Sequence, residues 1–340
     1  MKKTIYMLLP AMCLLASCTS NVSSSTNANN STPASSSSVT PSSSSQSSTS
    51  SSSQSSTSSS VPNTVITASD LKDLASEMEE INKSDRFEVP SKAWLTHVED
   101  MSFINVNVPE SEDYNAIMTM ESAYDLETGY YYTSMVYEDR LLEMTMTSKV
   151  YGYALDTKYI LASDEDGTKI YYEVECETND AAVEFAKTMV GEMGVVEDVA
   201  VEVKGIASLQ SLVGFVEQYE VNNDEDPSND VTNDYDSYVI GITANSENEN
   251  SFDATVTLDA SAKIEDEGMV QDSSIKGVLE VEYVDGYLTH SLDEATMVES
   301  MDMAGEVMSM TIYSKVESTI AYSYDATYPD LSEFTLTPLE

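Results

Sequence analysis

The feature that most constrains the fold is an alternation of apolar and polar residues that recurs along much of the chain. Successive side chains of a β-strand point to opposite faces, so a period of two predicts a strand with one buried face. Alternating segments predict strands at 149–155, 158–163, 169–176, 238–244, 252–258 and 307–324. Asp-Gly pairs at 166–167 and 285–286 are typical of two-residue hairpin turns. These patterns predict antiparallel strands that follow one another in a meander.

Other segments carry apolar residues at helical spacing. Residues 67–83 open with a Thr-x-x-Asp sequence that resembles a capping box, and they predict the first helix. Two further helices are expected at 180–190 and 206–219, with a strand at 195–203 between them. Together the elements predict an α+β fold, in which one large antiparallel sheet has a few helices packed on it.

The N-terminus has the composition of a secretory signal, in which two lysines precede an apolar run over 5–15. That run is shorter than the about 20 residues that a membrane-spanning helix needs. Leu-Ala-Ser-Cys at 15–18 resembles the lipobox of bacterial lipoproteins. The resemblance implies that residues 1–17 are removed and that Cys18 receives acyl chains such as palmitate. We therefore expect a lipid-anchored protein on the extracytoplasmic face of a cell membrane, since two or more chains anchor stably.

A Ser-rich stretch follows the anchor over residues 19–62. It has no apolar periodicity, so nothing in it offsets the entropy cost of ordering the backbone. We predict that residues 18–62, the lipidated Cys18 with this stretch, form a disordered linker whose flexible part spans roughly 35 Å. Residues 63–340 are then expected to form the β-rich domain.

The small number of cysteines limits the disulfide and thiol chemistry that this domain can have. Cys13 leaves with the signal and Cys18 is the anchor, so Cys176 is the one thiol left and no intrachain disulfide can form. Cys176 ends an alternating segment and has acidic neighbours, which raise the pKa of a thiol. We interpret it as a small buried hydrophobic residue instead of a reactive nucleophile.

The chain is strongly acidic, with 60 Asp and Glu against 15 Lys and Arg and a formal net charge of −45. Such a surface repels nucleic acid and anionic lipid headgroups, so neither is expected as a partner. It would attract divalent cations or a basic cell-wall protein.

Motifs for catalysis or for cofactor binding are missing from the sequence. His97 and His290 are the only histidines, and neither belongs to a metal-binding H-E-x-x-H. The sequence also has no G-x-S-x-G, P-loop or Gly-rich dinucleotide turn. The acidic residues at 164–167 with Glu173 match a calcium loop only in part and are interpreted as a turn. The acidic run at 222–236 is interpreted as a solvated loop, with weak Ca²⁺ binding as the alternative. We predict no enzyme, cofactor or specific metal site.

The whole pattern resembles Gram-positive lipoproteins with the LolA/LppX-like fold. The resemblance rests on the lipobox, the Ser-rich spacer, the opening helix, the Tyr- and Met-rich strands and the late Asp-Gly hairpin. The segments that carry it run from 150–153 through 169–172 and from 279–287 through 308–329. It implies a curved half-barrel of about eleven strands over residues 63–340, with helices on the concave side. Related carriers hold acyl chains in that apolar cleft, but no binding residue carries over one for one.

Met-x-Met pairs on the predicted strands are the candidate ligand-binding residues. The six candidates are Met118 and Met120, Met144 and Met146, and Met308 and Met310, and Met301 with Met303 is a fourth pair of the same spacing. Residues i and i+2 of a strand lie on one face, about 6.5–7 Å apart. The pairs suit a plain core, an adaptable apolar cleft for a lipid-like ligand, or thioether ligation of Cu(I). No His lies beside them, which weakens the copper interpretation.

The leading hypothesis is therefore an anchored lipoprotein that binds or carries a lipid or acyl chain. One alternative is a structural or interaction protein of the cell wall that uses its acidic surface. The other is a lipoprotein that binds Ca²⁺ or Cu(I).

Overall fold

The computed structural model describes residues 64–104, 113–223, 235–266, 269–303 and 306–338. The predicted signal peptide, Cys18 and the Ser-rich linker lie outside these residues. Most of the acidic loop at 222–236 also lies outside them.

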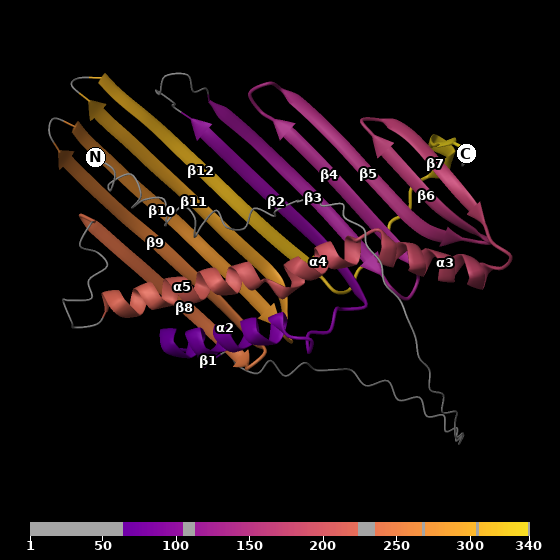
Figure 1. Cartoon of the computed structure of the whole chain (residues 1–340), viewed down its shortest axis with the longest axis horizontal. Helices are drawn as coiled ribbons and strands as arrows, with labels where there is room; N and C mark the ends of the chain where they lie inside the picture. The colour runs from indigo at the N-terminus through magenta and orange to yellow at the C-terminus, as the bar shows by residue number, and fades with distance from the viewer. Residues whose placement is uncertain (1–63, 105–112, 224–234, 267–268, 304–305, 339–340) are drawn as a thin grey trace, which may run out of the picture. The chain divides into compact units, whose positions relative to one another are not determined.

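A single open sheet of thirteen strands forms the main layer (Figure 1). The strands are β1 (Thr64–Val65), β2 (Lys92–Ile104), β3 (Tyr114–Asp125), β4 (Tyr130–Asp139), β5 (Met144–Leu155), β6 (Lys158–Glu165), β7 (Thr168–Glu175), β8 (Ser237–Asn248), β9 (Ser251–Asp266), β10 (Met269–Val284), β11 (Tyr287–Met303), β12 (Glu306–Ala321) and β13 (Thr335–Leu336). Their order across the sheet is β1-β8-β9-β10-β11-β12-β2-β3-β4-β5-β6-β7-β13. All neighbours are antiparallel except β7 and β13.

The order divides the long strands into two meanders, β2 to β7 and β8 to β12, which are joined where β12 pairs with β2. Both predicted Asp-Gly turns are present. Asp166 and Gly167 have φ values of 48° and 83°, and Asp285 and Gly286 have values of 52° and 86°. Positive φ at both central residues is what a type I′ hairpin turn requires, and its twist matches that of the flanking strands. The predicted antiparallel meander is confirmed.

The helices are α2 (Ala68–Lys83), α3 (Asn179–Glu192), α4 (Val195–Lys204) and α5 (Ile206–Asn222). The predicted capping box of α2 is formed: the hydroxyl of Thr67 accepts from the backbone N–H of Asp70, and the Asp70 carboxylate accepts from the N–H of Thr67, each at 3.2 Å. The helices expected at 67–83, 180–190 and 206–219 are confirmed as α2, α3 and α5.

The strand expected at 195–203 is wrong, because this segment is helix α4. Its valines favour a strand by local propensity, but Val195, Val199 and Val203 repeat every four residues and share one helical face. All three are buried in the core, so packing against the sheet outweighs the local preference of β-branched residues. Gly194 and Gly205, with φ of 74° and 54°, mark the two ends of the helix.

Helices α5, α4 and α3 lie end to end across the strands on one side of the sheet, and α2 packs beside α5 (Figure 1). Helix α3 contacts β4, β5 and β6, helix α4 contacts β2, β3 and β11, and α2 and α5 contact β8. Their buried residues, such as Leu71, Val199 and Leu212, form one core with Leu95 and Leu279 of the sheet. The helical run Val195–Asn222 is long and apolar enough to cross a membrane by length and composition, but half of its most apolar part is buried inside the fold.

The C-terminal segment packs on the other side of the sheet. Its residues Tyr324 and Phe334 lie against an aromatic cluster that includes Tyr130, Tyr132 and Tyr153. The hydroxyl of Tyr130 donates to the carbonyl oxygen of Thr327 at 2.9 Å. This packing covers an aromatic cluster on the side of the sheet opposite the helices.

Cys176 differs from the prediction. Strand β7 ends at Glu175, one residue earlier than expected, and Cys176 is a free thiol that is only half-buried. Its neighbour Glu175 is exposed, because the chain leaves the sheet here to enter α3.

Candidate functional site

The register of the sheet assigns each strand residue to one of two faces. Residues paired directly across antiparallel strands point to the same face, and neighbours in sequence point to opposite faces. Leu95 of β2 pairs with Ile320 of β12, and both pack with the helices. We call the face that contains them the helix face and the opposite one the outer face.

Every strand methionine whose side chain the structure describes lies on the helix face. These residues are Met101, Met118, Met120, Met135, Met144, Met146, Met269, Met297, Met301, Met308 and Met310. All six candidate residues of the sequence analysis are among them, whereas the side chain of Met303 lies outside the described residues. Strands that are far apart in the sequence thus place the same residue type, methionine, on one surface of the sheet.

The methionines occupy the part of the helix face that the helices leave uncovered. Figure 1 shows β2 to β5 and β9 to β12 continuing beyond the line of helices. Under the helices, Leu95, Tyr124 and Leu279 are buried. Beyond them, Met135, Met144 and Met146 are 40%, 42% and 41% exposed. We call this uncovered part, which consists of the methionines above with Phe103, Tyr114, Tyr137 and Ile312, the methionine face.

The candidate methionines form two groups on that surface. In the first group, Met120 pairs with Met135, while Tyr137 pairs with both Met118 and Met146. In the second group, Met301 of β11 pairs with Met308 of β12. Phe103 and Ile312, which pair with each other, and Met297 lie between the groups. The two groups therefore belong to one apolar surface but do not touch through directly paired residues.

A hollow of about 200 Å³ lies at the second group. It is lined by Met301, Met308 and Met310 together with Gln271 and Glu299. One acidic side chain, that of Glu299, borders this hollow.

Carboxylates on the methionine face lie in apolar surroundings. Asp293 of β11 is 8% exposed and pairs with Leu279 and Val316. Burial raises the pKa of Asp293 to about 7, and burial also raises the pKa of Glu299. Glu99 pairs with Val316 from the other side, so one strand separates it from Asp293. Sequence reasoning missed these residues among 60 acids, although Asp293 is in phase with Met297 and Met301 along β11.

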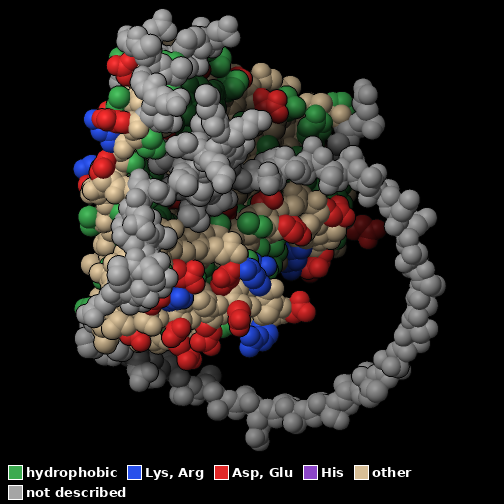
Figure 2. Space-filling model, turned by 60° about the vertical axis from the view of Figure 1, so that its left-hand side comes forward, with side chains coloured by type: hydrophobic (Ala, Val, Ile, Leu, Met, Phe, Trp, Pro, Cys, Tyr) green, Lys and Arg blue, Asp and Glu red, His purple; other side chains and the backbone are tan. Residues whose placement is uncertain are grey.

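The outer face carries the opposite chemistry. Every lysine of the described strands lies there, and these are Lys92, Lys149, Lys158, Lys169, Lys263, Lys276 and Lys315. Several are paired with acids, as in Lys276 with Asp259 at 3.0 Å and Lys315 with Glu317 at 2.8 Å. In Figure 2 acidic side chains are the commoner charged groups on the coloured surface, as the composition requires.

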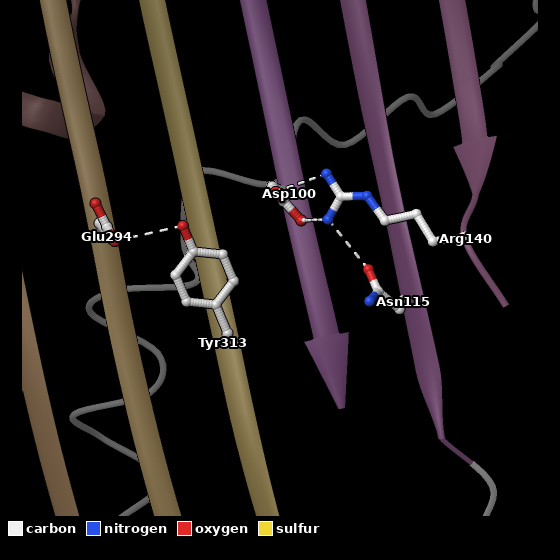
Figure 3. A network of polar contacts seen from close by, with 5 residues as sticks. All are labelled: Asp100, Asn115, Arg140, Glu294 and Tyr313. Carbon is white, nitrogen blue, oxygen red and sulfur yellow. Dashed lines mark hydrogen bonds and ion pairs between the residues drawn. The ribbon is translucent and has the colours of Figure 1, made fainter. Parts of the chain in front are cut away.

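Arg140 is also held on the outer face, at the end of β4. Its guanidinium donates to both carboxylate oxygens of Asp100, at 3.0 and 3.1 Å, and to the side-chain oxygen of Asn115 at 3.1 Å (Figure 3). Two parallel hydrogen bonds to one carboxylate fix the guanidinium plane. Nearby, the hydroxyl of Tyr313 donates to Glu294 at 3.3 Å. This network directs the positive charge of Arg140 away from the methionine face.

A buried polar chain marks where α4 meets the sheet. His97 Nδ1 lies 2.9 Å from the Ser318 hydroxyl, and His97 Nε2 lies 3.2 Å from Glu99. The Ser318 hydroxyl also lies 3.3 Å from a carboxylate oxygen of Glu202 on α4. Ser318 and His97 are only 2% and 6% exposed. The order Ser-His-Glu is that of a nucleophilic relay, but this hydroxyl is covered and engaged by a second carboxylate, which suits a structural role.

Replacement of Ser318 by Ala is expected to lower the free energy of unfolding by about 1–3 kcal/mol. The change leaves a nitrogen of His97 without its buried partner, and an unsatisfied buried polar group costs that much. Urea denaturation measures the loss. Ser314→Ala is the control, because Ser314 is on the same face of β12 and its side chain makes no hydrogen bond within the described residues. Equal losses in the two variants would contradict the structural role of Ser318.

The acidic turn between β6 and β7 has a structural explanation. The carboxylate of Asp164 accepts from the N–H of Gly167 at 3.1 Å, and Asp166 accepts from the N–H of Thr147 at 2.8 Å. Both acids thus satisfy backbone donors, and the interpretation of this segment as a hairpin turn is confirmed. Within the described ranges, no group of three or more His, Cys, Asp or Glu is placed to hold a metal ion.

The sequence matches no protein-family model, and a search of curated proteins finds no matching relative. The resemblance to LolA/LppX-like lipoproteins therefore stays a prediction.

Proposed function

We propose that this chain is a lipid-anchored extracytoplasmic protein that holds a lipid-like apolar ligand on its methionine face. In this proposal Cys18 carries the acyl anchor and residues 19–62 are the tether that separates the domain from the cell membrane. The sheet is bent as a half-barrel whose concave side carries the helices and the methionine face. The observation that carries the proposal is the exposed apolar surface beside a core that is already complete.

An adaptable binding surface explains the methionines better than a plain core does. Met297, which is buried, fits the role of a core residue, but Met135, Met144 and Met146 are each about two-fifths exposed. Contiguous exposed apolar surface is costly in a soluble domain and marks a site that something else covers. The flexible, polarizable side chain of Met adjusts to ligands of varied shape. An acyl chain, which has many conformers and few polar contacts, is such a ligand.

Binding is a better proposal than catalysis for this surface. Among the described residues, the Ser318–His97 pair is closed to a substrate, because Ser318 and His97 are only 2% and 6% exposed. Thioether ligation of Cu(I) or binding of Ca²⁺ would need ligands that converge on one point. The methionines instead spread over seven neighbouring strands, from β10 to β5 in the order of the sheet.

A neutral fluorescent naphthylamine probe tests the proposal on the mature chain carrying Cys18→Ser, which lacks acyl chains of its own. We expect saturable binding that Met135→Glu weakens by about tenfold or more, because the charge must be desolvated against the apolar probe. Val136→Glu is the matched control, since Val136 is the next residue and lies on the outer face. Failure of the parent chain to bind, or equal weakening by the two substitutions, would refute the proposal.

A second candidate function is binding of a basic cell-wall protein to the outer face. The observation that favours it is the row of acids on β9 and β10, where Asp253, Glu280 and Glu282 lie on the outer face. Such binding would weaken with salt, because exposed charges are screened. Salt-sensitive capture of a basic protein by the mature chain, lost on Glu280→Lys and with no lipid retained, would support this function. Capture that is insensitive to salt would argue against it.

A further inference from the structure

The charge pattern of the methionine face restricts the class of ligand, provided that the proposed function holds. Among the described strands, the helix face has no lysine or arginine at all, because all seven strand lysines lie on the outer face. Among the described strand residues, the charged side chains of this surface are carboxylates: Glu99, Asp139 and Glu299 lie on the uncovered part, and the buried Asp293 lies at its border, where it pairs with Leu279. An anionic headgroup would find no cation on this surface.

We propose that the methionine face selects an amphiphile with a single apolar chain and a positively charged headgroup, and that it discriminates against fatty acids and other anionic amphiphiles. The apolar chain lies on the methionines, and the cation pairs with one of the two carboxylates of β11, Asp293 or Glu299. The preference follows from charge complementarity in a site of low dielectric, where an ion pair is stronger than in water.

Asp293 is the first of the two carboxylates on β11 that we expect to pair with the cation. Its side chain is more than nine-tenths buried, and within the described residues it has no hydrogen bond or ion pair. A buried carboxylate without a partner is costly, and a bound cation would offset that cost. Glu99 lies on the same row of the sheet, one strand beyond Val316, which places the two backbones about 10 Å apart. A headgroup between them would meet negative charge from both sides.

Glu299 is the second carboxylate, and it lies at the other end of the surface. It is six residues from Asp293 on the same strand and face, a separation of about 20 Å. Glu299 borders the hollow that Met301, Met308 and Met310 line. Thioethers provide apolar contact there while the carboxylate provides the charge. Met297 lies between Asp293 and Glu299, so the apolar track is continuous along β11.

Several cations elsewhere in the described domain are held in ion pairs away from this surface. On the helices, Lys72 pairs with Glu220 at 3.0 Å and Lys187 pairs with Glu184 at 2.9 Å. Arg140 is bound to Asp100 on the outer face (Figure 3). An anionic ligand would have to break one of these ion pairs to gain the positive charge of Lys72, Lys187 or Arg140.

A series of amphiphiles with one dodecyl chain and different headgroups tests the inference. The mature chain with Cys18→Ser is titrated, below the micelle concentrations, with dodecyltrimethylammonium, dodecyl maltoside and dodecyl sulfate, which displace the neutral probe. High salt screens the general attraction of an acidic protein for cations. We expect the affinity for the cationic amphiphile to be at least about ten times that for the anionic one. The affinity for the neutral amphiphile should lie between the two.

Two variants locate the preference. Glu299→Gln and Asp293→Asn are expected to weaken binding of the cationic amphiphile severalfold more than binding of dodecyl maltoside, so that the cationic preference falls. Glu294→Gln, on the outer face of the same strand, is the control and is expected to change neither. Tight binding of all three headgroups, or variants without effect, would overturn the inference and leave the proposed function intact. Binding of none of them would refute the proposed function itself.

Discussion

Replacement of Asp293 by Asn is expected to stabilise the domain by about 2–4 kcal/mol near pH 8 and to change its stability little near pH 4. Burial raises the pKa of Asp293 in the folded state to about 7, from an ordinary value of 3.8. The folded state therefore binds the proton more tightly than the unfolded state does. The contribution of this group to stability is complete below about pH 4 and is lost as the pH rises through about 7. Asn resembles the neutral acid in shape and carries no charge to desolvate.

Urea denaturation of both chains across this pH range measures the effect. The difference between the parent chain and Asp293→Asn should grow with pH between about 4 and 7 and then level off. Asp259→Asn is the control, because Asp259 lies on the outer face, is exposed and pairs with Lys276. Parallel pH profiles for the parent and Asp293→Asn would show that the carboxyl is not desolvated as described.

The second large effect is expected at Gly152, where Ala should lower the free energy of unfolding by about 2–3 kcal/mol. Gly152 of β5 pairs directly with Tyr131 of β4, and the Tyr131 ring lies over the glycine. A Cβ atom at this position would be 2.0 Å from Cε1 of that ring. Tyr131 is fully buried, and its hydroxyl lies 3.3 Å from that of Tyr159, so the ring has no free space to enter.

Gly191→Ala is the control for Gly152→Ala, and it is expected to change stability in the opposite direction. Gly191 lies in α3, and a Cβ there would meet no atom within 4 Å. Gly191→Ala is expected to stabilise the domain by about 0.5–1 kcal/mol, because Ala loses less backbone entropy in a helix. Thermal or urea unfolding of the two variants gives the comparison. If Gly152→Ala were as stable as the parent chain, the close packing of Tyr131 on the glycine would be incorrect.

Local signals predicted the parts of the fold that depend on neighbours in sequence. The Asp-Gly turns and the capping box at Thr67 are short-range features, and they formed as expected. Helix α4 shows where such local signals fail. Its valines favour a strand by local propensity, but the segment is a helix in which three valines are buried against the sheet. The strand propensity of such residues depends on packing, which the sequence does not display.

The sequence predicted which residues belong to the candidate site, namely methionines, but it did not predict how the strands place them relative to one another. Period two placed each methionine pair on one face of its own strand. Only the pairing of β12 with β2, two strands from opposite ends of the domain, puts Met118 and Met310 on the same side of one sheet. The same pairing brings Ser318 to His97 across 221 residues. Contacts at such separations leave no periodic signal in the chain.

Methyl resonances of ¹³C-labelled methionine give the most direct test of the methionine face as the binding site. The mature chain with Cys18→Ser is titrated with dodecyl maltoside below its micelle concentration, and each methyl is assigned by a Met→Leu substitution. Saturable shifts are predicted for Met118, Met135, Met146, Met301 and Met310, with none for Met78 in the core or for Met193, an exposed residue at the end of α3. Saturable binding that leaves the methionine-face methyls unchanged, or that shifts Met193 alone, would contradict the proposed site.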